Sequence, residues 1–256
     1  MSLSKSQIAN LFSRDPQILT CVSIQSHERS VKVLKKVLGD NLYDSRILNY
    51  LGWFLQYSLD KTLMPNVELM KRYGIEQSHI LKLFYNYPKL LLHKSQTFKE
   101  CVRRVNETGV DTETKSYVYA IKTISSMSFK SWEQKLDVFR RLGYTNVDII
   151  LTFRRLPNVF AVSERKIKRT AEFLLNIGKF DLSYVLRYPH ILMYSLERRL
   201  KPRLRVLEIF EREKILEFKP NSIVFTCSDS KFFGKLVRPH MDKVEELSFD
   251  VKDART

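Results

Sequence analysis

LPNVFAVSERKIKRTAEFLLNIG, residues 156–178, is the stretch that decides the fold of this chain. Its apolar residues recur at intervals of four, three and three positions, which predicts one buried helix face made of Ile167, Ala171, Leu174 and Ile177. Gly178 would lie just beyond the helix end, where a left-handed backbone favours glycine. Pro157 ends any helix before it, because proline lacks an N–H and clashes with the preceding turn. The stretch therefore predicts a proline-led turn followed by an amphipathic helix.

The same arrangement recurs along the chain. Five of the seven glycines stand at positions 39, 74, 109, 143 and 178, with steps of 35, 35, 34 and 35 residues. A period of that length is typical of helical repeat proteins. The prolines form a second series, each after or beside an apolar segment: Pro16, Pro88, Pro157, Pro189 and Pro220. In the second repeat Gly52 stands near the expected proline, and in the fourth residues 122–125 take its place.

Each repeat is therefore interpreted as two helices. The first begins after a polar cap and ends at the proline, and the second ends at the glycine where there is one. The expected caps are Ser4, Asp44, Ser78, Asp111, Asn146 and Asp181. Seven repeats follow, at roughly 4–39, 44–74, 76–109, 111–143, 145–178, 180–212 and 214–245, and the last two lack the glycine. We expect an all-α, right-handed helical-repeat solenoid that forms a single array over residues 1–256.

Charge is the strongest signal in the composition. The net charge of +16 and the pI near 9.7 predict attraction to a polyanion, most often nucleic acid. The charge is uneven: residues 150–205 hold 13 Lys and Arg against 4 Asp and Glu, whereas residues 206–256 hold 9 against 10. No apolar run approaches 18 residues, which argues against a membrane-spanning helix. The three cysteines, Cys21, Cys101 and Cys227, lie far apart and fit a reducing compartment.

The position of the proline distinguishes among helical repeat families. Here it lies inside the repeat and is followed by an apolar pair, as in Pro88-Lys-Leu-Leu and Pro157-Asn-Val-Phe. SLDKTLMPNVELMKRYG (58–74) and SLERRLKPRLRVLEIF (195–210) share a serine-led start and an internal proline, and SDSKFFGKLVRPH (228–240) is a distinct closing segment. Over nearly the whole chain this order resembles the mitochondrial transcription termination factor (mTERF) family, most of all its plant branch. The resemblance implies a solenoid with a basic concave groove and a role in organelle gene expression.

Basic segments supply the candidate nucleic-acid-binding residues. RKIKR (165–169) and ERRLKPRLR (197–205) fall in consecutive repeats, so stacking would bring them near one another, and an extended cationic surface suits the closely spaced phosphates of a duplex. The candidates are Arg103, Arg104, Lys135, Arg165, Lys166, Lys168, Arg169, Arg198, Arg199, Lys201, Arg203, Arg205, Lys231, Lys235 and Arg238. The competing interpretation is that these side chains only solvate the outer faces of helices.

Catalysis finds little support. The five histidines are scattered without a metal-binding spacing, and no two glycines lie close enough for a phosphate-binding loop. Most phenylalanines, such as Phe84, Phe139, Phe173 and Phe210, stand at helical spacing among aliphatic residues and are assigned to the core. We expect a protein that is not an enzyme and needs neither a metal nor another cofactor.

The function expected from charge and resemblance together is a regulator that binds double-stranded DNA and acts in transcription or its termination. One alternative is an organellar RNA-binding factor for intron splicing or ribosomal RNA maturation, because RNA presents the same phosphates. A second is a scaffold that binds an acidic partner protein. The chain is expected to be monomeric and to work in the mitochondrion or, alternatively, the chloroplast. Its N-terminus, MSLSKSQIAN, shows no targeting pattern, so we expect the targeting peptide to be absent from this chain.

Overall fold

The computed structural model describes residues 4–18, 24–177, 180–215 and 222–241 of the 256-residue chain. The described residues form two compact bodies, within residues 1–129 and 130–256. All their regular structure is helical, which confirms the predicted all-α repeat fold. Gly178, Pro220 and Cys21, and the side chain of Ile177, lie outside the described residues, so their predicted roles stay predictions.

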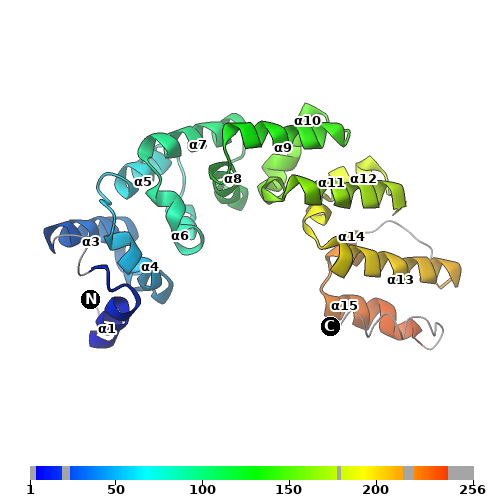
Figure 1. Cartoon of the computed structure of the whole chain (residues 1–256), viewed down its shortest axis with the longest axis horizontal. Coiled ribbons are helices and arrows are strands. Elements are labelled where there is room, and N and C mark those ends of the chain that lie inside the picture. The colour runs from blue at the N-terminus through cyan, green and yellow to red at the C-terminus, as the bar shows by residue number, and fades with distance from the viewer. Residues whose placement is uncertain (1–3, 19–23, 178–179, 216–221, 242–256) are drawn as a thin grey trace. The chain divides into compact units, whose positions relative to one another are not determined.

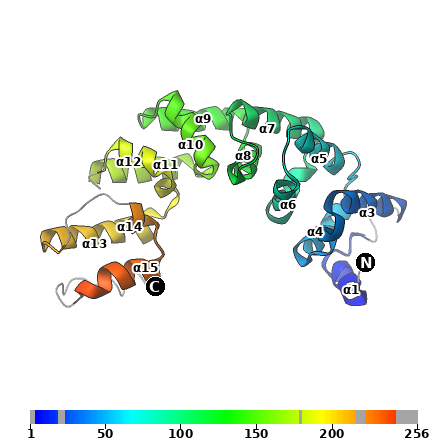
Figure 2. The same ribbon diagram turned by 180° about the vertical axis from the view of Figure 1, so that it is seen from behind.

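Helices of the N-terminal body alternate between two layers (Figures 1 and 2). Second helices of successive repeats lie in one layer, where α3 contacts α5 and α5 contacts α7; first helices lie in the other, where α4 contacts α6 and α6 contacts α8. The elements are α1 (Lys5–Arg14), α3 (Ile24–Leu38), η1 (Gly39–Tyr43), α4 (Ser45–Leu55), α5 (Leu63–Arg72), α6 (Gln77–Asn86), η2 (Pro88–Leu92), α7 (Ser95–Glu107) and α8 (Lys115–Ser125).

The C-terminal body continues the same order of first helix, turn and second helix. Its elements are α9 (Phe129–Arg141), α10 (Asn146–Arg155), η3 (Pro157–Ala161), α11 (Glu164–Glu172), η4 (Phe173–Ile177), α12 (Leu182–Arg187), η5 (Pro189–Met193), η6 (Leu196–Leu200), α13 (Lys201–Arg212), α14 (Ser222–Thr226), α15 (Asp229–Phe232), η7 (Phe233–Val237) and η8 (Arg238–His240). The segments η4, η6 and η7 are π-helical turns that extend α11, α13 and α15. The first helix of the last repeat is the short α14.

A proline opens the turn between the two helices in three repeats. Pro88, Pro157 and Pro189 each begin a buried five-residue 3-10 helix. The residue before each proline has nearly the same backbone, with φ between −126° and −146° and ψ between 51° and 70°. A residue before proline is sterically driven away from helical angles, so the first helix ends at the same point each time. This is the physical basis of the proline series.

The apolar residues after each proline form the core between the two helices. Leu91, Phe160 and Leu192 stand three positions after their prolines and are fully buried. Phe139 packs against Phe160 with ring centroids 4.5 Å apart, which joins one second helix to the next turn. The predicted core phenylalanines, Phe84, Phe139, Phe173 and Phe210, are all buried. The helix face predicted in residues 156–178 is buried as well at Ile167, Ala171 and Leu174.

Glycines close the second helices, as predicted. Gly39, Gly74, Gly109 and Gly143 all have positive φ, between 55° and 95°. The sixth repeat has no glycine, and there Lys214 takes the same left-handed conformation, with φ of 57°. Its N–H donates to the Glu211 carbonyl at 3.1 Å, and the next N–H, of Ile215, donates to the Phe210 carbonyl at 2.9 Å. The second helix of the sixth repeat is therefore followed by the same turn, with lysine where the earlier repeats have glycine.

Three of the six predicted helix caps are correct. Ser4, Asp44 and Asp181 each accept a hydrogen bond from the first turn of α1, α4 and α12. The other three predictions are wrong by one to three residues, because the caps of α6, α8 and α10 are Glu76, Thr114 and Thr145. For α10, Thr145 and Asp148 exchange hydrogen bonds in a capping box, so Asn146 is already helical.

Gly52 does not stand in for a proline, contrary to the prediction. It lies inside α4, which runs on to Leu55. A Cβ added at Gly52 would lie 2.5 Å from an oxygen of Asp15 and 2.7 Å from Ile18. The turn that contains Asp15 and Ile18 thus packs directly on the α4 backbone, and only glycine, which has no Cβ, leaves room for it.

Candidate nucleic-acid interface

The candidate cations of the C-terminal body cluster at the start of second helices. Serine caps each start: Ser163, Ser195 and Ser228 accept hydrogen bonds from the N–H groups of Lys166, Arg198 and Lys231. The caps are 32 and 33 residues apart, so equivalent turns carry the basic segments. The structure divides these cations into side chains that are used inside the protein and side chains that face solvent.

Lys135 and Arg203 are used inside the protein, which argues against the predicted contact with phosphate. Lys135 is 7% exposed and Arg203 is 2% exposed. The Lys135 ammonium donates to the Val162 carbonyl, and burial lowers its pKa. Arg203 donates to the carbonyls of Val224 and Cys227 at 2.6 and 2.9 Å and pairs with the exposed carboxylate of Asp229. A side chain so enclosed cannot reach a ligand.

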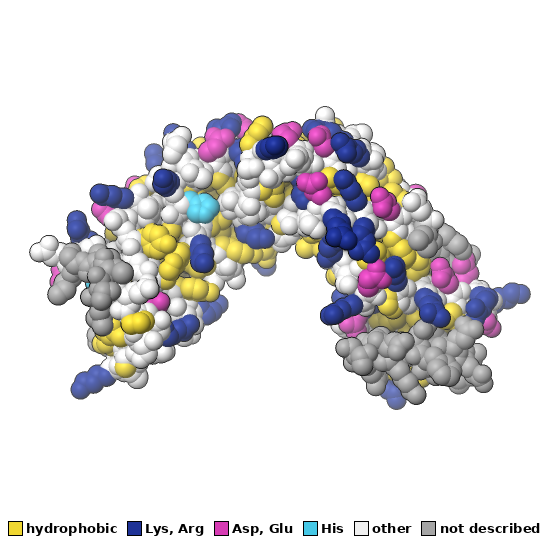
Figure 3. Space-filling view, viewed as in Figure 1, with side chains coloured by type: hydrophobic (Ala, Val, Ile, Leu, Met, Phe, Trp, Pro, Cys, Tyr) yellow, Lys and Arg dark blue, Asp and Glu magenta, His cyan; other side chains and the backbone are white. Residues whose placement is uncertain are grey.

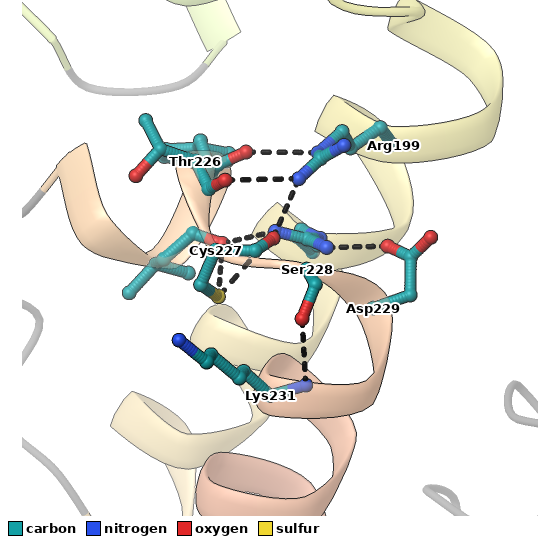
Figure 4. Close-up of polar contacts among 9 residues, drawn as sticks. Arg199, Thr226, Cys227, Ser228, Asp229 and Lys231 are labelled. Atoms are coloured by element: carbon teal, nitrogen blue, oxygen red, sulfur yellow. Dashed lines mark hydrogen bonds and ion pairs between the residues drawn. The ribbon is translucent and has the colours of Figure 1, made fainter.

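Arg199 is also committed to the protein backbone (Figure 4). Its guanidinium donates to the carbonyls of Phe225 at 2.9 Å, Thr226 at 3.2 Å and Cys227 at 2.5 Å. The same group lies over the Tyr194 ring at 4.4 Å. Half-buried Lys166 does the equivalent one repeat earlier, because its ammonium donates to the Met193 carbonyl. Both side chains are therefore held against the backbone of the next repeat.

The two candidates of the N-terminal body, Arg103 and Arg104, contact neighbouring side chains of the protein. Arg103 is exposed but pairs with Glu100 at 2.6 Å and with Glu107, three and four residues away on α7. Arg104 lies over the Phe129 ring at 5.6 Å, and one of its guanidinium nitrogens is buried without a hydrogen-bond acceptor among the described residues.

The remaining candidates of RKIKR and ERRLKPRLR are wholly or partly exposed, and Arg169 and Lys201 meet on the same carboxylate. Arg165, Arg169, Arg198, Lys201 and Arg205 are exposed, and Lys168 is half-buried. A groove between the starts of α11 and η6 is lined by Ser163, Arg165, Lys166, Arg169, Thr170, Ser195, Leu196 and Glu197. Glu197 sits between cations, 3.2 Å from Arg169 and 2.7 Å from Lys201. Figure 3 shows Lys and Arg side chains gathered over α11 and α13 with acidic side chains among them.

The last three candidates lie on the closing segment. Lys231, Lys235 and Arg238 are exposed on α15, η7 and η8. Lys231 and Lys235 line a second groove, whose wall includes Thr226, Cys227 and Ser228. The backbone held by Arg199 therefore forms one side of the groove that displays these lysines. Figure 4 shows Lys231 on the helix that follows this backbone.

Sequence reasoning missed a polar residue that recurs inside the second helices. Ser30 donates to the Tyr57 carbonyl at 3.2 Å, and Asn66 donates to the carbonyls of Leu91 and His93 at 3.0 and 2.8 Å. Lys135 and Arg203 occupy the matching places in later repeats. The available signal was a polar residue on an otherwise apolar helix face, recurring after 36, 69 and 68 positions, or about one or two repeat lengths.

The described ranges of the chain offer little to other kinds of site. No group of three or more His, Cys, Asp or Glu side chains within them could hold a metal ion. None of the described helices is long and apolar enough to cross a membrane. Burial raises the pKa of the Cys101 thiol to about 12, which leaves it an inert core residue.

Proline-led turns, left-handed helix ends and a polar residue that joins consecutive repeats define an all-α helical-repeat protein with cations at the starts of its second helices. Comparison with known families gives the particular class: the mTERF family model matches residues 1–233, and the chain belongs to that family.

A curated relative is also similar. The chain is 21% identical over 193 residues to the protein named transcription termination factor MTERF8, chloroplastic, of Arabidopsis thaliana. The match covers 74% of this chain but only 38% of the relative. This chain thus spans well under half the length of that protein.

Proposed function

We propose that this chain binds double-stranded DNA through the exposed cations at the starts of its second helices and acts in organelle transcription or its termination. The observation that carries the proposal is that Arg165 and Arg169 line one groove and that Arg169 and Lys201, from consecutive repeats, meet on Glu197. Exposed Arg198 directly follows Glu197 in the chain. Lys231 and Lys235 add cations one repeat further on. Cations distributed over successive repeats suit a phosphate backbone better than a small anion.

The family and the relative support the narrower part of the proposal. mTERF membership and the relative's name support a role in organelle gene expression, and that name favours the chloroplast over the mitochondrion. The proposed role is binding, not catalysis. A fluorescent fusion of the full-length protein tests the compartment, and cytosolic fluorescence would contradict it.

Salt dependence tests whether phosphates are bound. Affinity for a duplex should fall by roughly a thousandfold or more between ~50 and ~200 mM salt if six or more phosphates are contacted. The variant Arg165→Gln/Arg169→Gln/Arg198→Gln should bind weakly and show a shallower salt dependence. The matched control, Lys32→Gln/Lys35→Gln/Lys36→Gln, removes three exposed cations from α3. Equal reductions in affinity in the two variants would show that binding follows net charge alone.

Competition among nucleic acids tests the choice of DNA. Duplex DNA, single-stranded DNA and a structured RNA compete for the chain at one physiological salt concentration, and duplex DNA should win. A structured RNA that displaces the duplex would favour the splicing or rRNA role. Binding that does not respond to salt would point to a protein partner.

A further inference from the structure

Consecutive second helices of the C-terminal body are joined by a series of hydrogen bonds from Lys and Arg side chains to backbone carbonyls. Lys135 on α9 holds the Val162 carbonyl, one residue before the cap Ser163. Lys166, on the helix that Ser163 caps, holds Met193, two residues before the cap Ser195. Each of these cations therefore lies on one second helix and binds the backbone just before the start of the next second helix.

Arg199 makes the last link of this series, and Arg203 on α13 binds the same segment at the Val224 and Cys227 carbonyls. Arg199 lies in the first turn of the helix capped by Ser195, and its guanidinium spans the three carbonyls that precede the cap Ser228. Arginine is suited to this task, because its planar fork offers several N–H donors in a fixed geometry. These bonds use Nε and Nη2 of the guanidinium, so the side chain is held against the backbone of the next repeat.

The carbonyls held by Arg199 belong to the wall of the groove that displays Lys231 and Lys235. Thr226 and Cys227 line that groove together with the two lysines. Ser228 follows directly and caps the helix by accepting from the Lys231 N–H at 3.3 Å. A shift of the turn would therefore move the cap, the helix start and both lysines together.

We propose that Arg199 is a positioning residue for nucleic-acid binding: it fixes the Phe225–Cys227 turn so that Lys231 and Lys235 face phosphates, and it contacts no phosphate itself. The inference rests on the proposed function. It reverses the simplest interpretation of the ERRLKPRLR segment, in which every arginine is a ligand contact. Adjacent Arg198, which is exposed, keeps that direct role.

Hydrogen–deuterium exchange on the free protein tests the link to the turn without any ligand. In Arg199→Met, amides of residues 228–237 should exchange about tenfold faster, while those of α11 keep wild-type rates. Arg199→Lys keeps the charge with one donor group in place of three. Its exchange rates at residues 228–237 should lie between those of the wild type and Arg199→Met. Wild-type exchange at residues 228–237 in both variants would overturn the proposal.

A binding cycle with a labelled DNA duplex tests the positioning role. Lys231→Gln/Lys235→Gln should lower the salt-dependence slope by roughly 1.8, at about 0.9 for each phosphate that the protein no longer neutralises. Arg199→Met should lower the slope as much by itself and add nothing to the double variant. A further decrease of roughly 0.9 in the triple variant would mean that Arg199 contacts a phosphate directly, which overturns the proposal.

Two further outcomes separate this role from its neighbours. Faster exchange in Arg199→Met with unchanged DNA affinity would make the link purely structural and overturn the positioning role. If Arg199→Met does not fold, Arg199→Lys carries the cycle: it retains the charge, so a direct contact predicts a wild-type slope and a positioning role predicts a lower one. If the wild-type chain binds no nucleic acid, the proposed function itself fails, whereas the exchange result still reports on the link.

Discussion

Lys214 offers the sharpest test of the repeat geometry. It is exposed and holds a left-handed backbone with φ of 57°, where earlier repeats have glycine. Left-handed backbone costs an L-residue about 1–2 kcal/mol. Glycine removes that cost but gives the unfolded chain about 0.5–1 kcal/mol of extra freedom. Lys214→Gly should therefore stabilise the fold by roughly 0.5–1 kcal/mol.

Thermal unfolding followed by circular dichroism measures this gain. For a chain of this size, about 1 kcal/mol moves Tm by roughly 2–4 °C, so a rise of about 1–4 °C is expected. Lys214→Ala is the matched control, because it removes the same charge and keeps the strain. Gly74→Ala should lower Tm, since the φ of Gly74 is 75°. An added Cβ there meets nothing within 4 Å, so the loss would come from backbone strain and not from a steric clash. A Lys214→Gly variant that melts no higher than Lys214→Ala would refute the reasoning.

Three more predictions follow from other contacts. Gly52→Ala should destabilise the N-terminal body by roughly 1–3 kcal/mol through overpacking against Asp15 and Ile18, and an unchanged urea midpoint would contradict that close packing. Arg203→Gln should cost roughly 2–3 kcal/mol, because two carbonyls lose a charged donor, whereas Arg198→Gln should leave Tm unchanged; equal melting temperatures would show that Arg203 is dispensable. Hydrogen bonds from Arg46 lower the pKa of Asp44 to about 2, and hydrogen bonds from Thr145 and from Ser183 with the Tyr184 N–H lower the pKa values of Asp148 and Asp181. Each folded pKa lies below the unfolded value of 3.8, so the stabilisation is complete above that value and is lost as pH falls through the folded pKa. The melting temperature should therefore fall less steeply between pH 5 and pH 2 in Asp148→Asn/Asp181→Asn than in the wild type. Identical profiles of melting temperature against pH would count against these caps.

Local chemistry explains how much of the fold could be predicted. A proline restricts the residue before it, and a glycine tolerates positive φ, so each marks a turn from one position in the sequence. The period, the turns and the buried helix faces followed from these residues and from apolar spacing. The left-handed backbone at Lys214 could not be predicted, because the lysine residue type gives no indication of it. Gly52 was misassigned because its role comes from a segment more than 30 residues away.

The candidate site was predicted less completely, for the same reason. The sequence alone determined that this chain is a basic helical repeat and which segments carry its cations. Arg198 and Arg199 are adjacent and share one local pattern, yet one faces solvent and the other binds carbonyls 26 to 28 residues away. Only the tertiary structure decides between them, because the acceptors of Arg199 exist only where the next repeat packs. Helical periodicity places a side chain on a face, and the packing of neighbouring repeats decides whether that face meets water or backbone.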